Sequence, residues 1–172
     1  MTIKIYDNFL PEHEFKKIQD DVLGDTFPWY FNDSIVDLNN ASRKDFQFCH
    51  VLYRKNCVQS RAFDIFEPLF MRMNPFQIIR AKLNCNPYSD IEYESGMHTD
   101  FQSSTMPENI KMNSAVFYLN TNNGYTKFES SGKKLYSVEN RLVTFPVYEK
   151  HTGSKTTDSK VRVVLNLNYI PF

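Results

Sequence analysis

Three side chains of the kind that bind iron occur at a spacing that would let them share one ion. His98 and Asp100 are separated only by Thr99, and His151 lies much further along the chain. In an extended strand, residues i and i+2 point to the same side, about 7 Å apart. Two histidines and one carboxylate form the facial triad of non-haem Fe(II) sites, which leaves the opposite face of the metal open for reactants. The spacing therefore predicts an iron site with two ligands from one strand and a third from a distant segment.

Arg162 is a candidate partner for an anionic cosubstrate at the same site. Its guanidinium is planar and always charged, so it can hold a carboxylate through two parallel hydrogen bonds. It opens the last strand-like run of the sequence, 11 residues after His151. An iron triad combined with such an arginine indicates oxidation chemistry that uses a dicarboxylic 2-oxo acid, 2-oxoglutarate.

The same residues also have ordinary structural interpretations. A His-x-Asp triplet is short enough to occur by chance, and a strand arginine often pairs with a surface carboxylate. The combination favours a site, because His98 and His151 both border strand-like runs. The other two histidines have simpler explanations, since His13 falls in the first turn of an expected helix and His50 lies in a mixed segment.

Length and composition indicate one domain rich in β structure. The chain has 172 residues, enough for a substantial core, and it contains 15 Phe and 10 Tyr. Aromatic residues favour pleated, half-buried strands. The formal net charge is zero, whereas a nucleic-acid surface needs a basic stripe, so no nucleic-acid partner is expected.

Neither a membrane location nor an oxidising compartment is expected. No apolar run approaches the ~20 residues that span a bilayer, and the N-terminus lacks the apolar core of a signal peptide. The three cysteines, Cys49, Cys57 and Cys85, are an odd number without C-x-x-C spacing. A disulfide framework is therefore not expected, and the predicted location is the reducing cytoplasm.

The first 75 residues are expected to form a helical support layer. Residues 10–24 predict a helix that begins near Pro11, carries apolar residues at spacings of three and four, and ends at Gly24. A second helix is expected over residues 60–67, where Pro68 would disturb it. Short strands are expected at residues 3–6, 34–38 and 46–53.

From residue 76 onward, short apolar or alternating runs recur between Gly, Asn and Pro. Several short strands with turn signals between them are typical of a sandwich or barrel. Asn122, Asn123 and Gly124 predict a hairpin between two of these runs. The expected strands are residues 77–84, 114–119, 125–128, 141–145 and 161–169.

The expected fold is mainly β with N-terminal helices: a double-stranded β-helix, that is, a cupin-like jelly roll of seven or eight antiparallel strands. The chain is interpreted as a single domain over residues 1–172, with residues 1–75 as the support layer and 76–172 as the jelly-roll core strands. Such a fold directs side chains from facing strands into one open end, which would bring His98, Asp100 and His151 together.

Several stretches resemble the Fe(II)/2-oxoglutarate-dependent dioxygenase superfamily, in its prolyl-4-hydroxylase-like branch. They follow one another in the order of that family's strands, and residues 6–10 resemble its usual entry into a first helix. The resemblance covers most of the chain and rests on the combination of short motifs. The stretches are residues 79–84, 96–100, 117–120, 123–128, 140–145 and 151–162.

The resemblance implies a role for each candidate residue. His98, Asp100 and His151 would be the catalytic iron ligands, and Arg162 would bind the distal carboxylate of 2-oxoglutarate together with the Tyr118 hydroxyl. It implies Fe(II), 2-oxoglutarate and ascorbate as cofactors and dioxygen as a reactant. A peptidyl proline is the leading prime substrate, and small molecules remain open.

Other pocket residues are less sharply defined by sequence. Ser114 shares a strand face with Tyr118 and is a candidate for lining the cosubstrate pocket, although Tyr118 could equally be a packed aromatic. Asn84 and Tyr88 both lie near the position where the family often has a tyrosine. Two further amides, Asn166 and Asn168, share the face of Arg162 and indicate either a polar pocket or side chains that satisfy each other.

The sequence departs from the family pattern at two turns and leaves two rival functions open. Asn123 and Asn140 occur where the family commonly has glycine, and asparagine tolerates left-handed backbone better than most residues. The rivals are a non-catalytic metal-binding jelly roll and a hydrolytic zinc enzyme with the same ligands. Arg162 argues against the first, and the lack of an evident general base argues against the second. Residues 103–112 are either a cover for the metal or an ordinary surface connection.

Overall fold

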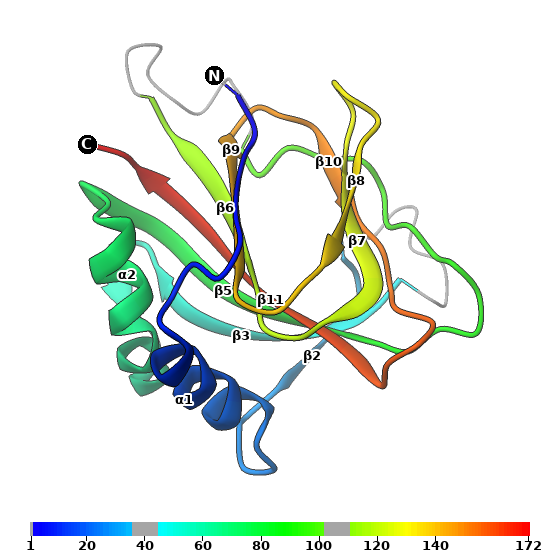
Figure 1. The fold of residues 1–172 in the computed structure, drawn as a ribbon, viewed down its shortest axis with the longest axis horizontal. Helices are drawn as coiled ribbons and strands as arrows, with labels where there is room; N and C mark the ends of the chain where they lie inside the picture. Colours follow the sequence, from blue (N-terminus) through cyan, green and yellow to red (C-terminus); the bar gives the residue numbers. More distant parts are fainter. Residues whose placement is uncertain (1, 36–44, 102–110) are drawn as a thin grey trace.

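The computed structural model describes residues 2–35, 45–101 and 111–172 (Figure 1). Its helical elements are α1 (Glu12–Leu23), the 3-10 helix η2 (Arg61–Phe66) and α2 (Glu67–Met73). Its strands are β1 (Lys4–Tyr6), β2 (Tyr30–Asn32), β3 (Gln47–Arg54), β4 (Cys57–Val58), β5 (Gln77–Pro87), β6 (Asn113–Tyr118), β7 (Asn122–Phe128), β8 (Lys134–Ser137), β9 (Arg141–Pro146), β10 (His151–Gly153) and β11 (Val161–Ile170).

The strands form two antiparallel sheets, which confirms the predicted mainly β jelly roll. The larger sheet has eight strands in the order β1-β9-β6-β11-β5-β3-β2, with β4 paired to β3. The smaller sheet has the order β10-β7-β8. Figure 1 shows the smaller sheet beside one face of the larger one, while α1 and α2 cover the opposite face. More strands form than the seven or eight expected, because the first 75 residues supply β1 to β4 as well as helices.

The first helix matches its expectation. Helix α1 runs from Glu12 to Leu23, begins with two glutamates in its first turn and ends at Gly24. Its buried residues are Phe15, Ile18 and Val22, which lie on one face at helical spacing. Burial of this face against the large sheet is what holds the helix in place, because a helix of this length is only marginally stable alone.

The second helix differs from its expectation at Pro68. The chain forms η2 from Arg61 to Phe66 and then continues as α2, with Pro68 in the first turn of α2. A proline lacks an N–H and is accepted where no intrahelical hydrogen bond would form. Pro68 therefore helps to start a helix rather than to disturb one. Ser60 caps the 3-10 segment by accepting a hydrogen bond from the Ala62 backbone N–H at 3.1 Å.

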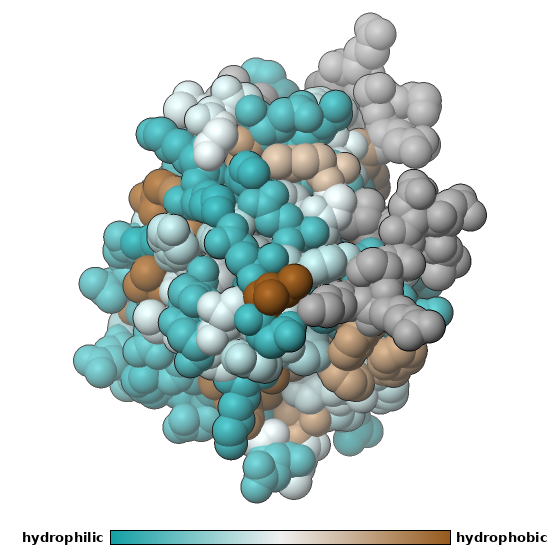
Figure 2. All heavy atoms as spheres, turned by 90° about the vertical axis from the view of Figure 1, so that its right-hand side faces the viewer, coloured by the Kyte–Doolittle hydropathy of each residue, from teal (hydrophilic) through white to brown (hydrophobic). Residues whose placement is uncertain are grey.

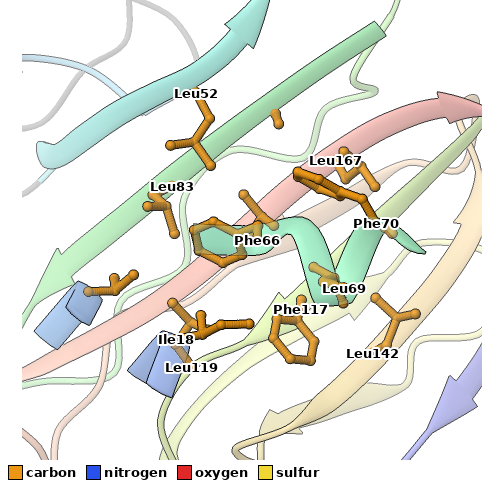
Figure 3. Close-up of a cluster of buried hydrophobic side chains, with 14 of the residues drawn as sticks. Ile18, Leu52, Phe66, Leu69, Phe70, Leu83, Phe117, Leu119, Leu142 and Leu167 are labelled. Carbon is orange, nitrogen blue, oxygen red and sulfur yellow. The ribbon is translucent and has the colours of Figure 1, made fainter. Parts of the chain in front are cut away.

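The strands of the large sheet have an apolar face toward the helices and a second face toward the small sheet. On β11, the odd-numbered residues from Val161 to Tyr169 belong to the core under the helices. The even-numbered residues, Arg162, Val164, Asn166 and Asn168, point the other way. Figure 3 shows the apolar side, where Phe66 and Phe70 lie near Leu83, Phe117 and Leu167.

A smaller apolar cluster lies between the two sheets. It contains Val116, Tyr118, Phe128, Val143, Phe145 and Val164. The rings of Phe128 and Phe145 meet edge to face with centroids 5.0 Å apart. This cluster closes one part of the space between the sheets and leaves the part beside β5 and β11 to polar side chains. Seen from the side in Figure 2, the described surface is mainly hydrophilic, with isolated hydrophobic residues.

The hairpin predicted at Asn122, Asn123 and Gly124 is wrong. Strands β6 and β7 belong to different sheets, and the three residues are the beginning of β7 itself. The register of β7 against β8 shifts between Asn122 and Tyr125. The turn that does join β7 to β8 contains Gly132, whose φ is 64°.

Two expectations fall on parts of the chain outside the described residues. These are most of the expected strand at residues 34–38 and the connection at residues 103–110. No described helix is long and apolar enough to cross a membrane. The three cysteines are all free, as expected, with Cys49 and Cys85 buried and Cys57 exposed.

Asn140 joins the N-terminal segment to the sheet, and this junction is testable. Its φ is 58°, its Oδ1 accepts from the Leu10 N–H at 2.9 Å, and its Nδ2 donates to the Leu10 carbonyl at 2.8 Å. Asn140→Gly keeps the left-handed backbone but removes both buried hydrogen bonds. We expect it to lower the free energy of unfolding by about 2 kcal/mol in urea denaturation.

The control for that variant is Asn8→Gly, at an exposed residue with φ 49°. It makes the same change of residue type at another left-handed position. Equal stability of the Asn140→Gly and Asn8→Gly proteins would contradict the anchoring role of the Asn140 amide.

Candidate metal centre and adjoining cavity

The two candidate histidines and the aspartate meet in space. Each of His98, Asp100 and His151 offers one ligand atom, and these atoms all lie within 4.8 Å of one another. The backbones of His98 and His151 exchange hydrogen bonds of 3.0 and 2.9 Å, which fixes the two histidines side by side. His151 begins β10, whereas His98 takes part in an isolated bridge rather than in the regular strand that was expected.

Backbone carbonyls orient both imidazole rings. Nδ1 of His98 lies 3.1 Å from the Gly96 carbonyl, and Nδ1 of His151 lies 3.0 Å from the Glu149 carbonyl. A carbonyl oxygen only accepts, so each Nδ1 carries a proton, and Nε2 is the nitrogen of each ring that remains for a metal ion. A hydrogen bond from Nδ1 to a carbonyl fixes the orientation of a histidine ring that binds a metal ion through its other nitrogen.

Asp100 is held by two neutral donors from the large sheet. Its Oδ2 accepts a short hydrogen bond from Ser114 Oγ and one of 2.8 Å from Asn168 Nδ2. Asn168 Nδ2 also donates to Ser114 Oγ at 2.9 Å, so the three groups form one network.

These surroundings favour the protonation states that a metal requires. Burial alone would raise the pKa of Asp100, but the charge of His151 and the hydrogen bonds from Ser114 and Asn168 outweigh it and hold that pKa below its usual value. Burial, followed by repulsion from His151, lowers the pKa of His98. A carboxylate and neutral imidazoles are the forms that bind metal ions.

Arg162 is a buried cation with hydroxyl neighbours. Only 3% of its surface is exposed. Its Nε donates to Ser137 Oγ at 2.8 Å, and its Nη2 donates to Thr126 Oγ1 at 3.1 Å. None of the ion pairs between described residues includes Arg162. Burial lowers the pKa of Arg162, which reflects the loss of hydration around a charge that has no carboxylate partner among the described residues.

Two glycines make room for this guanidinium. A Cβ on Gly124 would lie 2.5 Å from Cδ of Arg162, a distance that packed atoms do not reach. A Cβ on Gly153 would lie 3.4 Å from Arg162 Nη1, at the edge of ordinary contact. Gly124 is therefore required for the close approach of Arg162 rather than for a turn. Its Asn-Gly motif is also typical of turns, and for this reason the sequence predicts a hairpin here.

A cavity of about 310 Å³ connects the triad to Arg162. Gly153 lies two residues after His151 on β10, so the guanidinium beside Gly153 is separated from the triad by roughly 7 Å of strand. That interval matches the length of a five-carbon dicarboxylate. The large sheet lines this cavity mainly with polar side chains, together with two valines: Gln47, Arg80, Lys82, Asn84, Asn86, Val116, Val164 and Asn166, in addition to the candidate site residues.

The remaining sequence candidates occupy different places. Tyr118 is fully buried behind the cavity, donates to Thr126 Oγ1 at 2.8 Å and has its ring 5.6 Å from Arg162 Cζ. Ser114 lies against Asp100 rather than along the cavity wall. Asn84 lines the cavity, whereas Tyr88 is 55% exposed and does not line it. The two amides of β11 have different neighbours. Asn166 lines the cavity wall, and Asn168 is hydrogen-bonded to Asp100.

Three residues of the site were missed by sequence reasoning. Thr126 and Ser137 bind Arg162 from β7 and β8, in the sheet opposite β11. Asn86 lines the cavity and lies directly across from Arg162 in the β5–β11 register. Asn86 lies two residues after Asn84 on the same strand, so the sequence indicates that both point to one face. Nothing in the sequence pairs Thr126 or Ser137 with Arg162.

His50 has the structural role that was expected for it. Its Nδ1 and Nε2 lie 2.7 Å from the Pro28 carbonyl and from Ser60 Oγ, respectively. Both ring nitrogens are therefore occupied by hydrogen bonds, and His50 has no free ligand atom for a metal.

Comparison with known proteins finds structural likeness without sequence matches. No family model matches the chain, and no curated protein matches it. Among solved structures, a prolyl hydroxylase of Trichoplax adhaerens, in complex with a hypoxia inducible factor oxygen degradation domain peptide fragment, has a TM-score of 0.69 at 14% identity. That match covers 98% of this chain and 83% of the hydroxylase.

Two further structures share the fold. The viral collagen prolyl hydroxylase of Paramecium Bursaria Chlorella virus-1, as a 2OG complex, has a TM-score of 0.57 at 13% identity and covers 100% of this chain and 97% of its own. The non-heme alpha ketoglutarate dependent epimerase SnoN from nogalamycin biosynthesis has a TM-score of 0.66 at 9% identity, covering 98% and 77%. At these identities the likeness shows the fold alone.

The tight contact at Gly124 gives a direct test of how Arg162 is packed. Gly124→Ala places a methyl group against Cδ of Arg162 and should lower the free energy of unfolding by about 1–3 kcal/mol, measured in urea. Gly153→Ala is the matched control, because its methyl group would meet Nη1 at 3.4 Å and should be tolerated better. A Gly124→Ala protein at least as stable as Gly153→Ala would show that the guanidinium is packed elsewhere.

Proposed function

We propose that the protein is an Fe(II)- and 2-oxoglutarate-dependent dioxygenase that hydroxylates a C–H bond and releases succinate and carbon dioxide. One observation carries this proposal. A two-histidine, one-carboxylate cluster shares a cavity with a buried guanidinium that pairs with no carboxylate among the described residues. The cluster suits a divalent metal and the guanidinium suits one end of a dicarboxylate.

The donor set fits Fe(II) in type and number. His98 and His151 would present Nε2, and Asp100 would present carboxylate oxygen, from the same side of the ion. Ser114 and Asn168 both bind Oδ2 of Asp100, so the carboxylate is held in one orientation. Phe145 packs edge to face on the His151 ring with centroids 4.8 Å apart and restricts its rotation.

The other end of the cavity fits the distal carboxylate of 2-oxoglutarate. Arg162 would bind this carboxylate, while Ser137 and Thr126 hold the guanidinium plane. Tyr118 donates to Thr126 and supports the same network from behind, so its proposed role is indirect. Asn84 and Asn86 in the wall would complete the polar surroundings of the cosubstrate.

Bound Fe(II) and 2-oxoglutarate would supply the dioxygen activation and the two-electron oxidation that the side chains cannot provide. The protein's own contribution is positional. It fixes the orientation of two imidazoles through the Gly96 and Glu149 carbonyls, holds Asp100 ionised, and supplies a fixed positive charge at the far end of the cavity. Ascorbate is included in the proposal as a reductant that would keep the iron in its Fe(II) state.

The leading prime substrate is a peptidyl proline. The solved structures with this fold include three prolyl hydroxylases, one of which is in complex with a peptide fragment. The SnoN epimerase shares the fold as well, so the fold alone does not define the reaction. The three free cysteines support a reducing compartment, and we propose the cytoplasm.

The two rival functions are less well supported. A purely metal-binding jelly roll has no use for a buried, carboxylate-free guanidinium, which is costly to keep. A hydrolytic zinc enzyme needs a general base beside the metal. Among the described residues that line the cavity, Asp100 is the sole carboxylate, and it belongs to the metal triad.

Anaerobic titration distinguishes the role of the metal triad from the role of Arg162. We expect Fe(II) with 2-oxoglutarate to produce a visible charge-transfer band. His98→Ala should lose metal binding. Arg162→Met should keep the metal but weaken 2-oxoglutarate binding by about 100-fold, because it removes a bidentate charged contact. His13→Ala, at an exposed histidine, is the control. Normal 2-oxoglutarate affinity in Arg162→Met, with the fold intact by circular dichroism, would refute the proposal.

The hydrogen bonds to Asp100 predict that removing one donor weakens metal binding, by less than the loss of a metal ligand would. Asn168→Ala removes one donor to Oδ2 of Asp100 and should weaken Fe(II) or Mn(II) binding by roughly 10–100-fold in calorimetry. Asn166→Ala is the matched control, because Asn166 lies two residues away on the same strand face and lines the cavity. If both variants bind metal alike, the hydrogen bond to Asp100 does not support the metal site.

A further inference from the structure

A second and larger hollow adjoins the candidate metal centre. Its volume is about 880 Å³, and it shares Arg80, Lys82 and Asp100 with the smaller cavity. The shared residues place it directly beside the triad. A substrate lying in this hollow would therefore reach the metal beside Asp100.

Three cations face this hollow from neighbouring strands. Arg54 on β3 lies directly across from Arg80 on β5. Lys82 follows Arg80 at the spacing of two that puts both on one face. Like charges directly opposite on paired strands destabilise a sheet unless something compensates them. Lys55, at the adjoining turn, adds a fourth positive charge to the lining.

The described residues offer these cations no carboxylate partner. No ion pair within the described part of the chain includes Arg54, Arg80 or Lys82. Asp100 is the one acidic residue among the described lining, and it is already engaged by Ser114 and Asn168 beside the histidines. The hollow therefore has an excess of positive charge.

Burial raises the free-energy cost of the positive charge on Lys82. Its pKa is lowered, first by burial and also by repulsion from Arg80, and only partly restored by Cys49 and Asp100. An anion bound beside the ammonium would replace the hydration that burial removes.

Arg80 and Arg162 lie far apart along the paired strands. In the β5–β11 register, Arg162 lies across from Asn86, whereas Arg80 lies across from Asn168. Six residues of strand separate these two positions, which is about 20 Å. Arg80 and Lys82 also line the smaller cavity, so their effects on 2-oxoglutarate binding and on peptide binding are measured separately.

The shape and lining of the hollow suit a peptide. Two aromatic side chains in its lining, Tyr30 and Phe31, are each 63% exposed, so apolar surface lies next to the charges. A peptide segment presents both apolar and acidic groups. A nucleic acid is less well matched, because its phosphates call for a basic stripe, whereas the formal net charge of this chain is zero.

We propose that Arg54, Arg80 and Lys82 form a subsite that binds an acidic side chain of a peptide substrate, close to the residue presented to the metal. This inference rests on the proposed function, since it assigns the class of substrate for the same site. It narrows that class to peptides with aspartate or glutamate near the oxidised residue.

Peptide binding tests this subsite without turnover. Three labelled peptides of equal length, each with a central proline flanked by Glu, Gln or Lys, are titrated by fluorescence anisotropy. The 172-residue chain is supplied with Fe(II) and 2-oxoglutarate under anaerobic conditions. We expect the Glu peptide to bind at least about tenfold more tightly than the Gln peptide at low salt, with the difference shrinking as salt rises.

Variants link the preference to the three cations. Arg80→Gln and Lys82→Gln should bring the Glu peptide close to the affinity of the Gln peptide. Arg54→Gln, at an exposed position that tolerates substitution, should reduce the preference in the same direction. Arg72→Gln makes the same charge change on α2, outside the hollow, and should keep the preference intact.

Several results would overturn the subsite. These are equal affinities for the Glu and Gln peptides, no measurable binding of any peptide, a preference that survives in Arg80→Gln and Lys82→Gln, or tighter binding of an oligothymidylate. A rise in the dissociation constant of 2-oxoglutarate, without a change for the peptide, would assign the cations to the cosubstrate instead. Metal and 2-oxoglutarate affinities are measured in parallel, so their loss would count against the proposed function and leave the peptide result separate.

Discussion

The burial of the Arg162 charge is the constraint around which the rest of the site is arranged. A guanidinium that leaves water must recover its hydrogen bonds, and here two hydroxyls, from Ser137 and Thr126, supply part of them. Gly124 and Gly153 have no side chains where the guanidinium passes. The structure thus surrounds a positive charge with neutral groups, and a carboxylate from outside the chain would complete its pairing.

The alternating direction of side chains along β11 explains how one sheet contributes to both the apolar core and the polar site. Its odd-numbered residues pack beneath α1 and α2, while Arg162, Asn166 and Asn168 face the small sheet. Strand β5 follows the same rule, with Leu83 in the core and Lys82 in the cavity wall. A shift of one residue in register would exchange the two faces, so the apolar core also fixes the position of the polar site.

The sequence was informative where chemistry is local and weaker where it depends on packing between sheets. The spacing of His98 and Asp100 and the parity of β11 correctly anticipated which side chains come together. Periodicity could not show that Ser114 lies at the metal end of its strand rather than along the cavity wall. Thr126 approaches Arg162 only because the two sheets stack on each other. Gly124 is needed for the close approach of Arg162, but an Asn-Gly sequence is equally typical of a turn.

The central claim is that Arg162 pairs with the distal carboxylate of a ligand whose other end lies at the triad. A thermodynamic cycle tests it most directly, using 2-oxoglutarate and 2-oxopentanoate, which has the same chain length but no distal carboxylate. With anaerobic Fe(II) present, we predict that the unaltered protein prefers 2-oxoglutarate by about 100-fold and that Arg162→Met shows almost no preference. The same preference in both proteins would contradict this account of the site.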